Sequence, residues 1–351
     1  MQGTDFILRS LVADGVDHLF MMTGGLVDPF LPAFARVPEL TPVVAAHEGG
    51  AAAMADGYAR ASGRIGACLC IGGPGLTNTV TSISAAYTDE SPVLLITGEV
   101  ENYMQGLGLF QDATASTYND TEIIRPVTIQ SYSIPDVRLL HHKYSRAIKS
   151  MVDGARRPAH LPSPRDGQNG EIDVVPGPVG PALLNSMSLD HEMAKTLWSM
   201  ADGAPRIVIL VGGGVIADNA TADLMAVAER FSIPIATTEH AKGVMPEDHP
   251  LALGVFGYAG TPHATDAILG KELDLLVVLG STLNVRDSMY WTDKLAPKRG
   301  IYSVNVSAVH VACHTLPGQE PFVRGQGGAF LRWLLQASDS DAAALLNLKT
   351  G

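Results

Sequence analysis

A glutamate, Glu48, lies where the apolar stretch 42–46 gives way to an alanine-rich stretch that runs to Gly63. This pattern indicates a strand followed by a helix, and it places Glu48 at the carboxyl end of the strand, where α/β sheets bind ligands. A carboxyl group in that position can exchange a proton with a bound ligand. The alternative is structural, because an acid in the first turn of a helix is stabilised by the helix dipole.

Two further expected strands, residues 18–22 and 65–71, also run into segments that contain glycine. Segments at the carboxyl ends of strands are where α/β sheets bind ligands. Glycine allows a backbone to approach a ligand closely. The segments are Thr23-Gly24-Gly25 and Gly73-Pro74-Gly75-Leu76-Thr77-Asn78.

Strands and helices alternate along the chain, which predicts an α/β protein with doubly wound parallel sheets. A length of 351 residues suggests two domains. We expect domains at 1–186 and 187–340, with a tail at 341–351. The expected strands are 18–22, 42–46, 65–71 and 92–98 in the first domain and 207–211, 233–237, 273–279 and 301–306 in the second.

Three segments have a less regular pattern. Residues 156–180 are rich in proline, glycine and charge, so we expect a loop or linker, followed by a strand at 181–185. In the second domain a glycine turn precedes an expected helix at 217–231. Gly212, Gly214 and Ala217 match only a loose form of the dinucleotide-binding fingerprint, which is a weak signal.

Composition excludes several classes of protein. The formal net charge of −12 argues against nucleic acid and anionic membranes as partners. Cys68 and Cys70 are two residues apart in an apolar run, so both should face one side of a buried strand as reduced core residues; with Cys313 they form no disulfide framework. We find no secretion signal and no apolar run of membrane-spanning length, and we expect a cytoplasmic protein.

Several of these motifs together resemble one family. The run from His47 to Gly63 resembles the Glu-x-x-Ala…Gly-Tyr-Ala-Arg signature of thiamine-diphosphate enzymes, and Gly73 to Asn78 resembles the Gly-Pro-Gly-x-Thr-Asn loop that follows it. Ile96-Thr97-Gly98 and Phe110-Gln111 are similar to acetolactate synthases in particular. Residues 211–215, 234–238, 242–250 and 254–257 resemble the central domain of that family.

The resemblance implies roles for individual residues. Glu48 would share a proton with ring nitrogen N1′ of the cofactor, which favours the tautomer that removes the C2 proton. Gln111 would face the substituent on C2. The alternative is structural: a glutamine in a loop whose side chain forms hydrogen bonds with the backbone. Helix capping is the alternative for Asn78. The implied cofactor-binding residues are Thr23, Gly24, Gly25, Glu48, Gly73, Pro74 and Asn78.

One departure from the family is clear. Its members carry a third domain in which a Gly-Asp-Gly…Asn motif holds Mg²⁺ and the diphosphate, and no Gly-Asp-Gly occurs in these 351 residues. The resemblance therefore implies a pyrimidine-binding domain plus a Rossmann-like central domain, with the diphosphate-binding domain absent and no metal ligand in the chain. A partner subunit would hold Mg²⁺ and share thiamine diphosphate. The expected assembly is an α₂β₂ heterotetramer that self-associates through the pyrimidine domain.

The implied activity is decarboxylation of a small 2-oxo acid, followed by ligation to an acceptor or release of an aldehyde. A non-catalytic nucleotide-binding or regulatory subunit is the main alternative, and a plain Rossmann dehydrogenase is disfavoured because its loose fingerprint opens the second domain. FAD or ADP in the central domain is also disfavoured. Gly280-Ser281-Thr282 and Val304-Asn305 replace family residues there, although Gly212 to Gly214, Thr237, Lys242 and Arg286 match.

Overall fold

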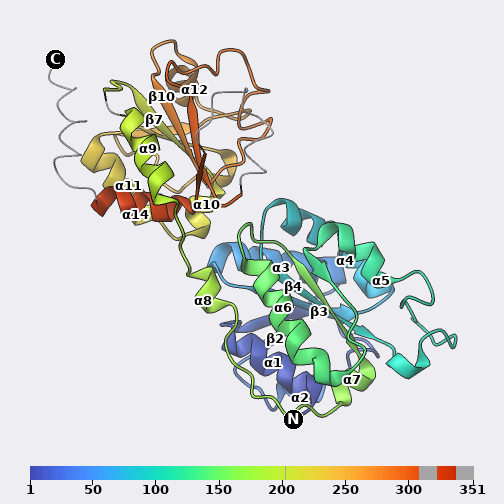
Figure 1. The fold of residues 1–351 in the computed structure, drawn as a ribbon. Coiled ribbons are helices and arrows are strands. Elements are labelled where there is room, and N and C mark those ends of the chain that lie inside the picture. Colours follow the sequence, from blue (N-terminus) through green and yellow to red (C-terminus); the bar gives the residue numbers. More distant parts are fainter. Residues whose placement is uncertain (202, 308–321, 337–351) are drawn as a thin grey trace. The chain divides into compact units, whose positions relative to one another are not determined.

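The structure, a computed structural model, describes residues 1–351 except 202, 308–321 and 337–351. The chain divides into two compact units, Met1–Ser186 and Met187–Gly351 (Figure 1). Each unit is built on one six-stranded sheet in which all the strand pairs are parallel. The predicted fold class, two parallel α/β sheets, is confirmed. Cys313 and the expected tail at 341–351 lie outside the described residues.

The first sheet has the strand order β2-β1-β3-β4-β6-β5. Its strands are β1 (His18–Met21), β2 (Thr41–Val44), β3 (Gly66–Ile71), β4 (Val93–Glu99), β5 (Gln130–Ser131) and β6 (Ala159–Pro164). The helices are α1 (Gly3–Ala13), α2 (Phe30–Phe34), α3 (Glu48–Ser62), α4 (Pro74–Thr88), α5 (Asp120–Ile124), α6 (Leu140–Val152), α7 (Arg165–Asn169) and α8 (Pro181–Leu184), with 3₁₀ turns η1 (Asn102–Met104), η2 (Arg125–Val127) and η3 (Val137–Leu139).

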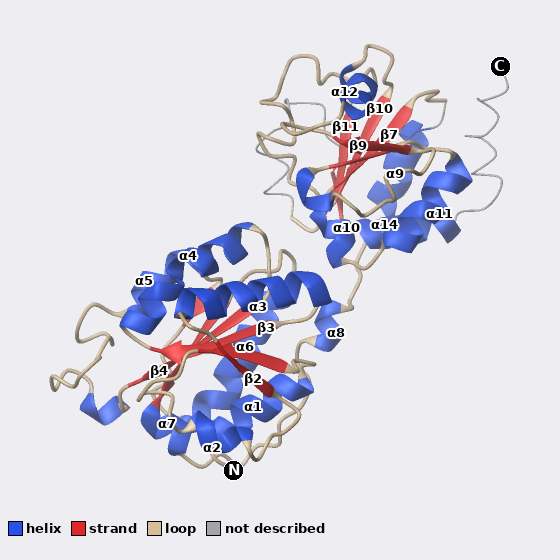
Figure 2. Cartoon of the chain, turned by 180° about the vertical axis from the view of Figure 1, so that it is seen from behind, coloured by secondary structure: helices blue, strands red, loops and turns tan. Residues whose placement is uncertain are grey.

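Helices cover both faces of this sheet. Figure 2 shows α3 and α4 along one face and α1 and α2 along the other. Side chains of β3 alternate between the two cores: Ala67 and Leu69 pack with α1 and α6, whereas Cys68 and Cys70 pack with α3 and α4. The two cysteines are free and buried on one face, as predicted.

Two expectations for the end of this unit are wrong. Residues 156–180 are not a linker, because they contain the buried strand β6 and helix α7. The prolines of β6 had suggested a loop, but β5 pairs only with Ala159 and His160. Pro162 and Pro164 lie beyond that ladder, on a stretch that pairs with β4 alone, so a missing N–H is tolerated there. The segment 181–185, expected as a strand, instead forms the short helix α8 (Pro181–Leu184), with proline at its first position.

The second sheet has the order β12-β11-β10-β7-β8-β9. Its strands are β7 (Ile207–Val211), β8 (Ile235–Thr237), β9 (Ala252–Val255), β10 (Leu275–Leu279), β11 (Ile301–Asn305) and β12 (Phe322–Arg324). The helices are α9 (His191–Ala201), α10 (Gly213–Ala217), α11 (Thr221–Phe231), α12 (Pro262–Leu269) and α14 (Gly327–Gln336), with a 3₁₀ turn η4 (Glu239–Ala241).

The second core has the same layered construction. In β7, Ile207, Ile209 and Val211 face a cluster that includes α9, α11 and α14, while Val208 and Leu210 face α12. The helix expected at 217–231 begins only at Thr221, as α11, because Asn219 before it has a left-handed backbone with φ of 51°. The expected glycine turn leads directly into the short helix α10. Among the described residues, no helix is long and apolar enough to cross a membrane.

Candidate active site

Glu48 is the first residue of α3, which begins after β2 at the carboxyl edge of the first sheet. His47 caps the helix: its Nδ1 accepts a hydrogen bond of 3.0 Å from the N–H of Gly49. The Glu48 side chain is half-buried. The position predicted from sequence, at the start of a helix that follows a strand, is therefore the position observed.

Asn78 holds one oxygen of Glu48. The Asn78 side-chain amide donates a hydrogen bond of 3.0 Å to Oε2 of Glu48. Oε1 faces Gly75, where an added Cβ would lie 3.7 Å away, and it has no hydrogen-bond partner among the described residues. Glu48 thus presents one fixed oxygen and one oxygen that can accept or share a proton, which fits a ring nitrogen of a bound heterocycle.

The Gly73 turn places Asn78. Gly73 precedes α4 with φ of 64° and ψ of −118°, a conformation that favours glycine, and Pro74 occupies the first helical position. We expected a loop up to Asn78, but the helix already begins at Pro74. The N–H of Gly73 donates a hydrogen bond of 2.6 Å to Oδ2 of Asp120. The structure therefore brings Glu48, Gly73, Pro74 and Asn78 together.

Thr23, Gly24 and Gly25 follow β1 at the same edge. A Cβ added to Gly24 would lie 2.5 Å from Cγ2 of Ile71, the last residue of β3, so only glycine fits against that strand end. The carbonyl of Gly25 accepts a hydrogen bond of 2.7 Å from Arg165. These residues share the edge with Glu48, although no direct contact to Glu48 is seen for the described residues.

Gln111 lies in the loop that passes over the Gly73 turn. Its carbonyl oxygen would be 3.8 Å from a Cβ added to Gly73. Its backbone is left-handed, with φ of 63°, which is unusual for a residue with a side chain. The backbone is thus close to the turn, but no side-chain hydrogen bond fixes the Gln111 amide in the described part of the chain. Its neighbour Phe110 is 85% exposed.

Two buried acids at this edge were not predicted. Glu99 ends β4 and Asp120 begins α5, and both side chains are buried. Burial, together with the neighbouring charges of Asp120 and Asp112, raises the pKa of Glu99 to about 8. Burial also raises the pKa of Asp120 to about 7, against the lowering effect of the Gly73 N–H. Both lie outside any motif, so no local signal in the sequence pointed to them.

A metal centre is not seen: the described residues contain no cluster of three His, Cys, Asp or Glu side chains able to hold an ion. The corresponding edge of the second sheet, where a nucleotide was considered, is tightly packed. A Cβ added to Gly212 would lie 2.4 Å from the carbonyl oxygen of Gly280, so this glycine allows two backbone segments to touch.

The basic residues of that edge already have acidic neighbours. Lys242 forms an ion pair with Glu247, and Arg286 lies 3.7 Å from Glu239 and over the ring of Tyr258. Both cations keep exposed side chains, and exposed ion pairs of this kind are weak.

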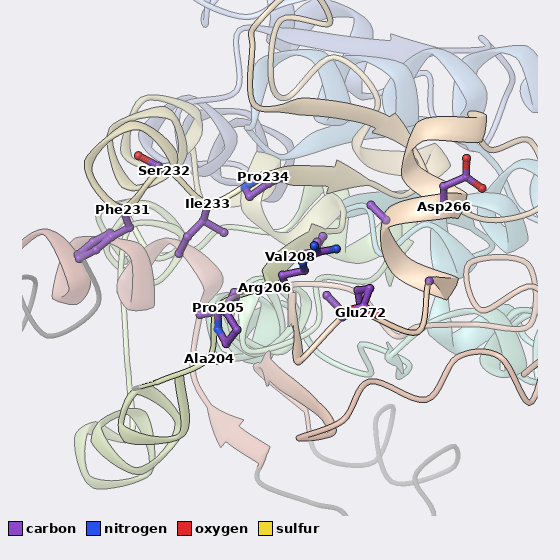
Figure 3. A pocket seen from close by; sticks show the side chains of 14 residues that line it. Ala204, Pro205, Arg206, Val208, Phe231, Ser232, Ile233, Pro234, Asp266 and Glu272 are labelled. Carbon is purple, nitrogen blue, oxygen red and sulfur yellow. The ribbon is translucent and has the colours of Figure 1, made fainter. Parts of the chain in front are cut away.

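A cavity of about 380 Å³ lies at the opposite edge of the second sheet, where β7, β8 and β10 begin. Figure 3 shows its walls, which are mainly apolar and carry Arg206, Asp266 and Glu272. Sheets of this type bind ligands at the carboxyl ends of their strands, so this cavity does not belong to the candidate site.

Two family descriptions match the chain. Residues 1–120 match the N-terminal TPP-binding domain of the thiamine pyrophosphate enzymes, and residues 194–323 match the central domain of the same enzymes. An X-ray structure from Mycobacterium smegmatis, provisionally described as a thiamin diphosphate-dependent enzyme, superposes with a TM-score of 0.78, covering 95% of this chain and 62% of that one. At 21% identity this likeness concerns the fold.

Curated relatives point in the same direction. A Methanocaldococcus jannaschii protein, provisionally named an acetolactate synthase large subunit, is 34% identical over 89% of this chain and 52% of its own length. The large subunit of acetolactate synthase isozyme 1 from Escherichia coli is 32% identical over 87% of this chain and 52% of its own length. The chain spans about half the length of these relatives. It belongs to the thiamine pyrophosphate enzymes, of which it carries the N-terminal TPP-binding domain and the central domain.

Proposed function

We propose that this chain forms part of an acetolactate-synthase-like enzyme that acts on a small 2-oxo acid, and that Glu48 activates the cofactor. The observation that carries the proposal is the half-buried Glu48 carboxyl, with Oε2 bound to Asn78 and Oε1 open. Thiamine diphosphate, when bound, supplies the carbon nucleophile that attacks the oxo acid. Glu48 shares a proton with the pyrimidine ring nitrogen, which is general acid–base help from a positioned group.

The other residues of the edge bind and orient. Asn78 holds the Glu48 carboxyl in one orientation through the 3.0 Å hydrogen bond. The Gly73-Pro74 turn and the Thr23–Gly25 segment let the backbone come close to the pyrimidine ring. Gln111 reaches the substrate side from a loop whose backbone already lies beside the turn.

Replacing Glu48 tests this proposal. In Glu48→Gln the amide can still accept the Asn78 hydrogen bond but cannot share a proton. We expect hydrogen–deuterium exchange at C2 of the cofactor, followed by NMR in the assembled enzyme, to slow by about two to four orders of magnitude. Folding should persist, since a first-turn charge contributes only about 0.3–1 kcal/mol.

The matched control is Glu39→Gln, which removes one negative charge from an exposed residue and should leave the exchange rate unchanged. Unchanged exchange in Glu48→Gln, with assembly intact, would show that another group activates the cofactor. Assembly is measured on the same sample.

We further propose that Mg²⁺ and the diphosphate are held by a segment or separate chain with a Gly-Asp-Gly…Asn motif, in an α₂β₂ assembly. Support comes from the 351-residue sequence, which has no such motif. Mg²⁺ bridged to phosphate oxygens carries much of the electrostatic attraction in such sites. Calorimetric titration of this chain alone with cofactor and Mg²⁺ should therefore show weak binding. Tight stoichiometric binding would contradict the shared site.

A further inference from the structure

The carboxyl group of Asp120 binds the turn before α4 through one oxygen, and its other oxygen has no hydrogen-bond partner in the described part of the chain. The side chain is fully buried, and Oδ2 accepts the 2.6 Å hydrogen bond from the N–H of Gly73. Oδ1 is also buried and has no hydrogen-bond partner in the described part of the chain. A buried carboxyl oxygen without a partner is unfavourable, so its retention calls for an explanation.

Glu99 lies beside Asp120. A Cβ added to Gly72 would be 2.9 Å from Oδ2 of Asp120 and 3.9 Å from Cγ of Glu99, so the two side chains adjoin one point, and the charge of Asp120 acts on the Glu99 carboxyl group. Two buried carboxyl groups this close disfavour double ionisation, and one of them keeps a proton. Burial raises the pKa of both groups, but the charge of Asp120 raises that of Glu99 as well, while the Gly73 N–H lowers that of Asp120, so we assign the retained proton to Glu99.

The surroundings of Asp120 contain no opposing cation among the groups that act on it. The titratable groups that interact with it are Glu99 on β4, Tyr118 on the preceding loop and the thiol of Cys70 on β3. The Gly73 N–H is its hydrogen-bond donor. A negative charge on Asp120 is therefore stabilised mainly by that N–H at the start of α4.

The first two turns of α4 link this acid to Glu48. Asp120 holds Gly73 immediately before the helix, and Glu48 holds the side chain of Asn78 within it. We propose that Asp120 is a positioning residue for Glu48: its carboxylate fixes the Gly73 turn and thereby the Asn78–Glu48 hydrogen bond, while Glu99 retains the neighbouring proton. The importance of this arrangement for activity rests on the proposed function of Glu48, but the effect of Asp120 on Gly73 and Asn78 does not.

Protonation of Asp120 weakens this arrangement. A hydrogen bond to a carboxylate is shorter and stronger than one to a neutral carboxyl group. Below neutral pH the Gly73 turn should therefore loosen, and the Asn78 amide should respond, because α4 carries both residues.

The test is an NMR titration of the chain without cofactor. The backbone amide of Gly73 and the side-chain amide of Asn78 are followed between about pH 5 and pH 9, a range that brackets both raised pKa values. We expect the two signals to move together with a midpoint near pH 7. Asp120→Asn keeps an oxygen acceptor for Gly73 but cannot titrate, so the step near neutrality should disappear from both signals.

Two further variants complete the experiment. Titration of Glu99 should add a second, separate step near pH 8 to these signals. Glu99→Gln should remove that step and leave the step near pH 7. Asp153→Asn, an exposed aspartate, is the matched control and should change neither signal. A neutral step that persists in Asp120→Asn, or an Asn78 signal that does not follow Gly73, would overturn the proposal.

If Asp120→Asn does not fold, the wild-type titration decides, because a Gly73 amide that stays constant through neutral pH also overturns it. These signals require no cofactor. Failure here is thus distinct from failure of the proposed function, which is judged by C2 exchange in Glu48→Gln.

Discussion

The carboxyl edges of the two sheets differ although the folds are alike. In the first unit this edge carries the half-buried Glu48 with one open oxygen and the buried acids Glu99 and Asp120. In the second unit Gly212 touches the backbone of Gly280 at the same edge. The cations there, Lys242 and Arg286, lie beside acids.

The comparison shows how function is separated from fold. Both sheets provide a topological switch point where a ligand can bind. Among the described residues, Asp120 of the first unit keeps a buried carboxyl oxygen without a hydrogen-bond partner, whereas the buried Asp287 of the second unit accepts a hydrogen bond from Asn284. At the corresponding edge of the second unit, the glycine turn packs directly against the backbone of Gly280.

The largest expected effect concerns the buried acids. A carboxyl group whose pKa is raised on folding binds more protons in the folded state, so stability falls as pH rises from its unfolded to its folded value. For Glu99 this window runs from 4.5 to about 8. Wild type therefore loses stability as pH rises through this window, and Glu99→Gln does not. The stability of the variant relative to wild type should increase by on the order of 2–4 kcal/mol from acidic to alkaline pH.

Amide hydrogen exchange in β4, measured across pH for wild type and Glu99→Gln, reports this change in stability of the first unit. Asp287→Asn is the matched change in the second unit, where burial also raises the pKa of a carboxyl group. Asp287 accepts a 3.0 Å hydrogen bond from Asn284. The gain in stability of Asp287→Asn with rising pH should therefore have the same sign as that of Glu99→Gln and be smaller. An equal or larger shift for Asp287 would remove the difference between the two edges.

A smaller effect is expected from the glycine turn of the second unit. Gly212→Ala places a Cβ 2.4 Å from the Gly280 carbonyl oxygen and should destabilise this unit by about 1–3 kcal/mol. Gly213→Ala, whose Cβ would meet only His240 at 3.8 Å, is the matched control and should be nearly neutral.

Urea unfolding followed by tryptophan fluorescence measures this change, because the three tryptophans, Trp198, Trp291 and Trp333, all lie in the second unit. If Gly212→Ala were as stable as Gly213→Ala, the turn would be open after all. The second edge would then again be a candidate for ligand binding.

Local patterns in the sequence determined much of the architecture. Continuous apolar runs predicted the buried parallel strands β3, β4, β7 and β10, because a strand covered on both faces has no polar side. The start of α3 at Glu48 and the glycine turn at Gly73 were also visible, since each depends on the conformational preferences of neighbouring residues.

Tertiary structure decided what local patterns do not encode. Strand β6 resembles a linker in sequence because of its prolines. It is a strand because all of it pairs with β4, while Pro162 and Pro164 lie beyond the short ladder with β5. Asp120 is 47 residues from Gly73, and its contact arises because β3 and β4 end side by side while α5 returns to the same edge. A buried carboxyl group is defined by what surrounds it, and these surroundings come from segments far apart in the chain.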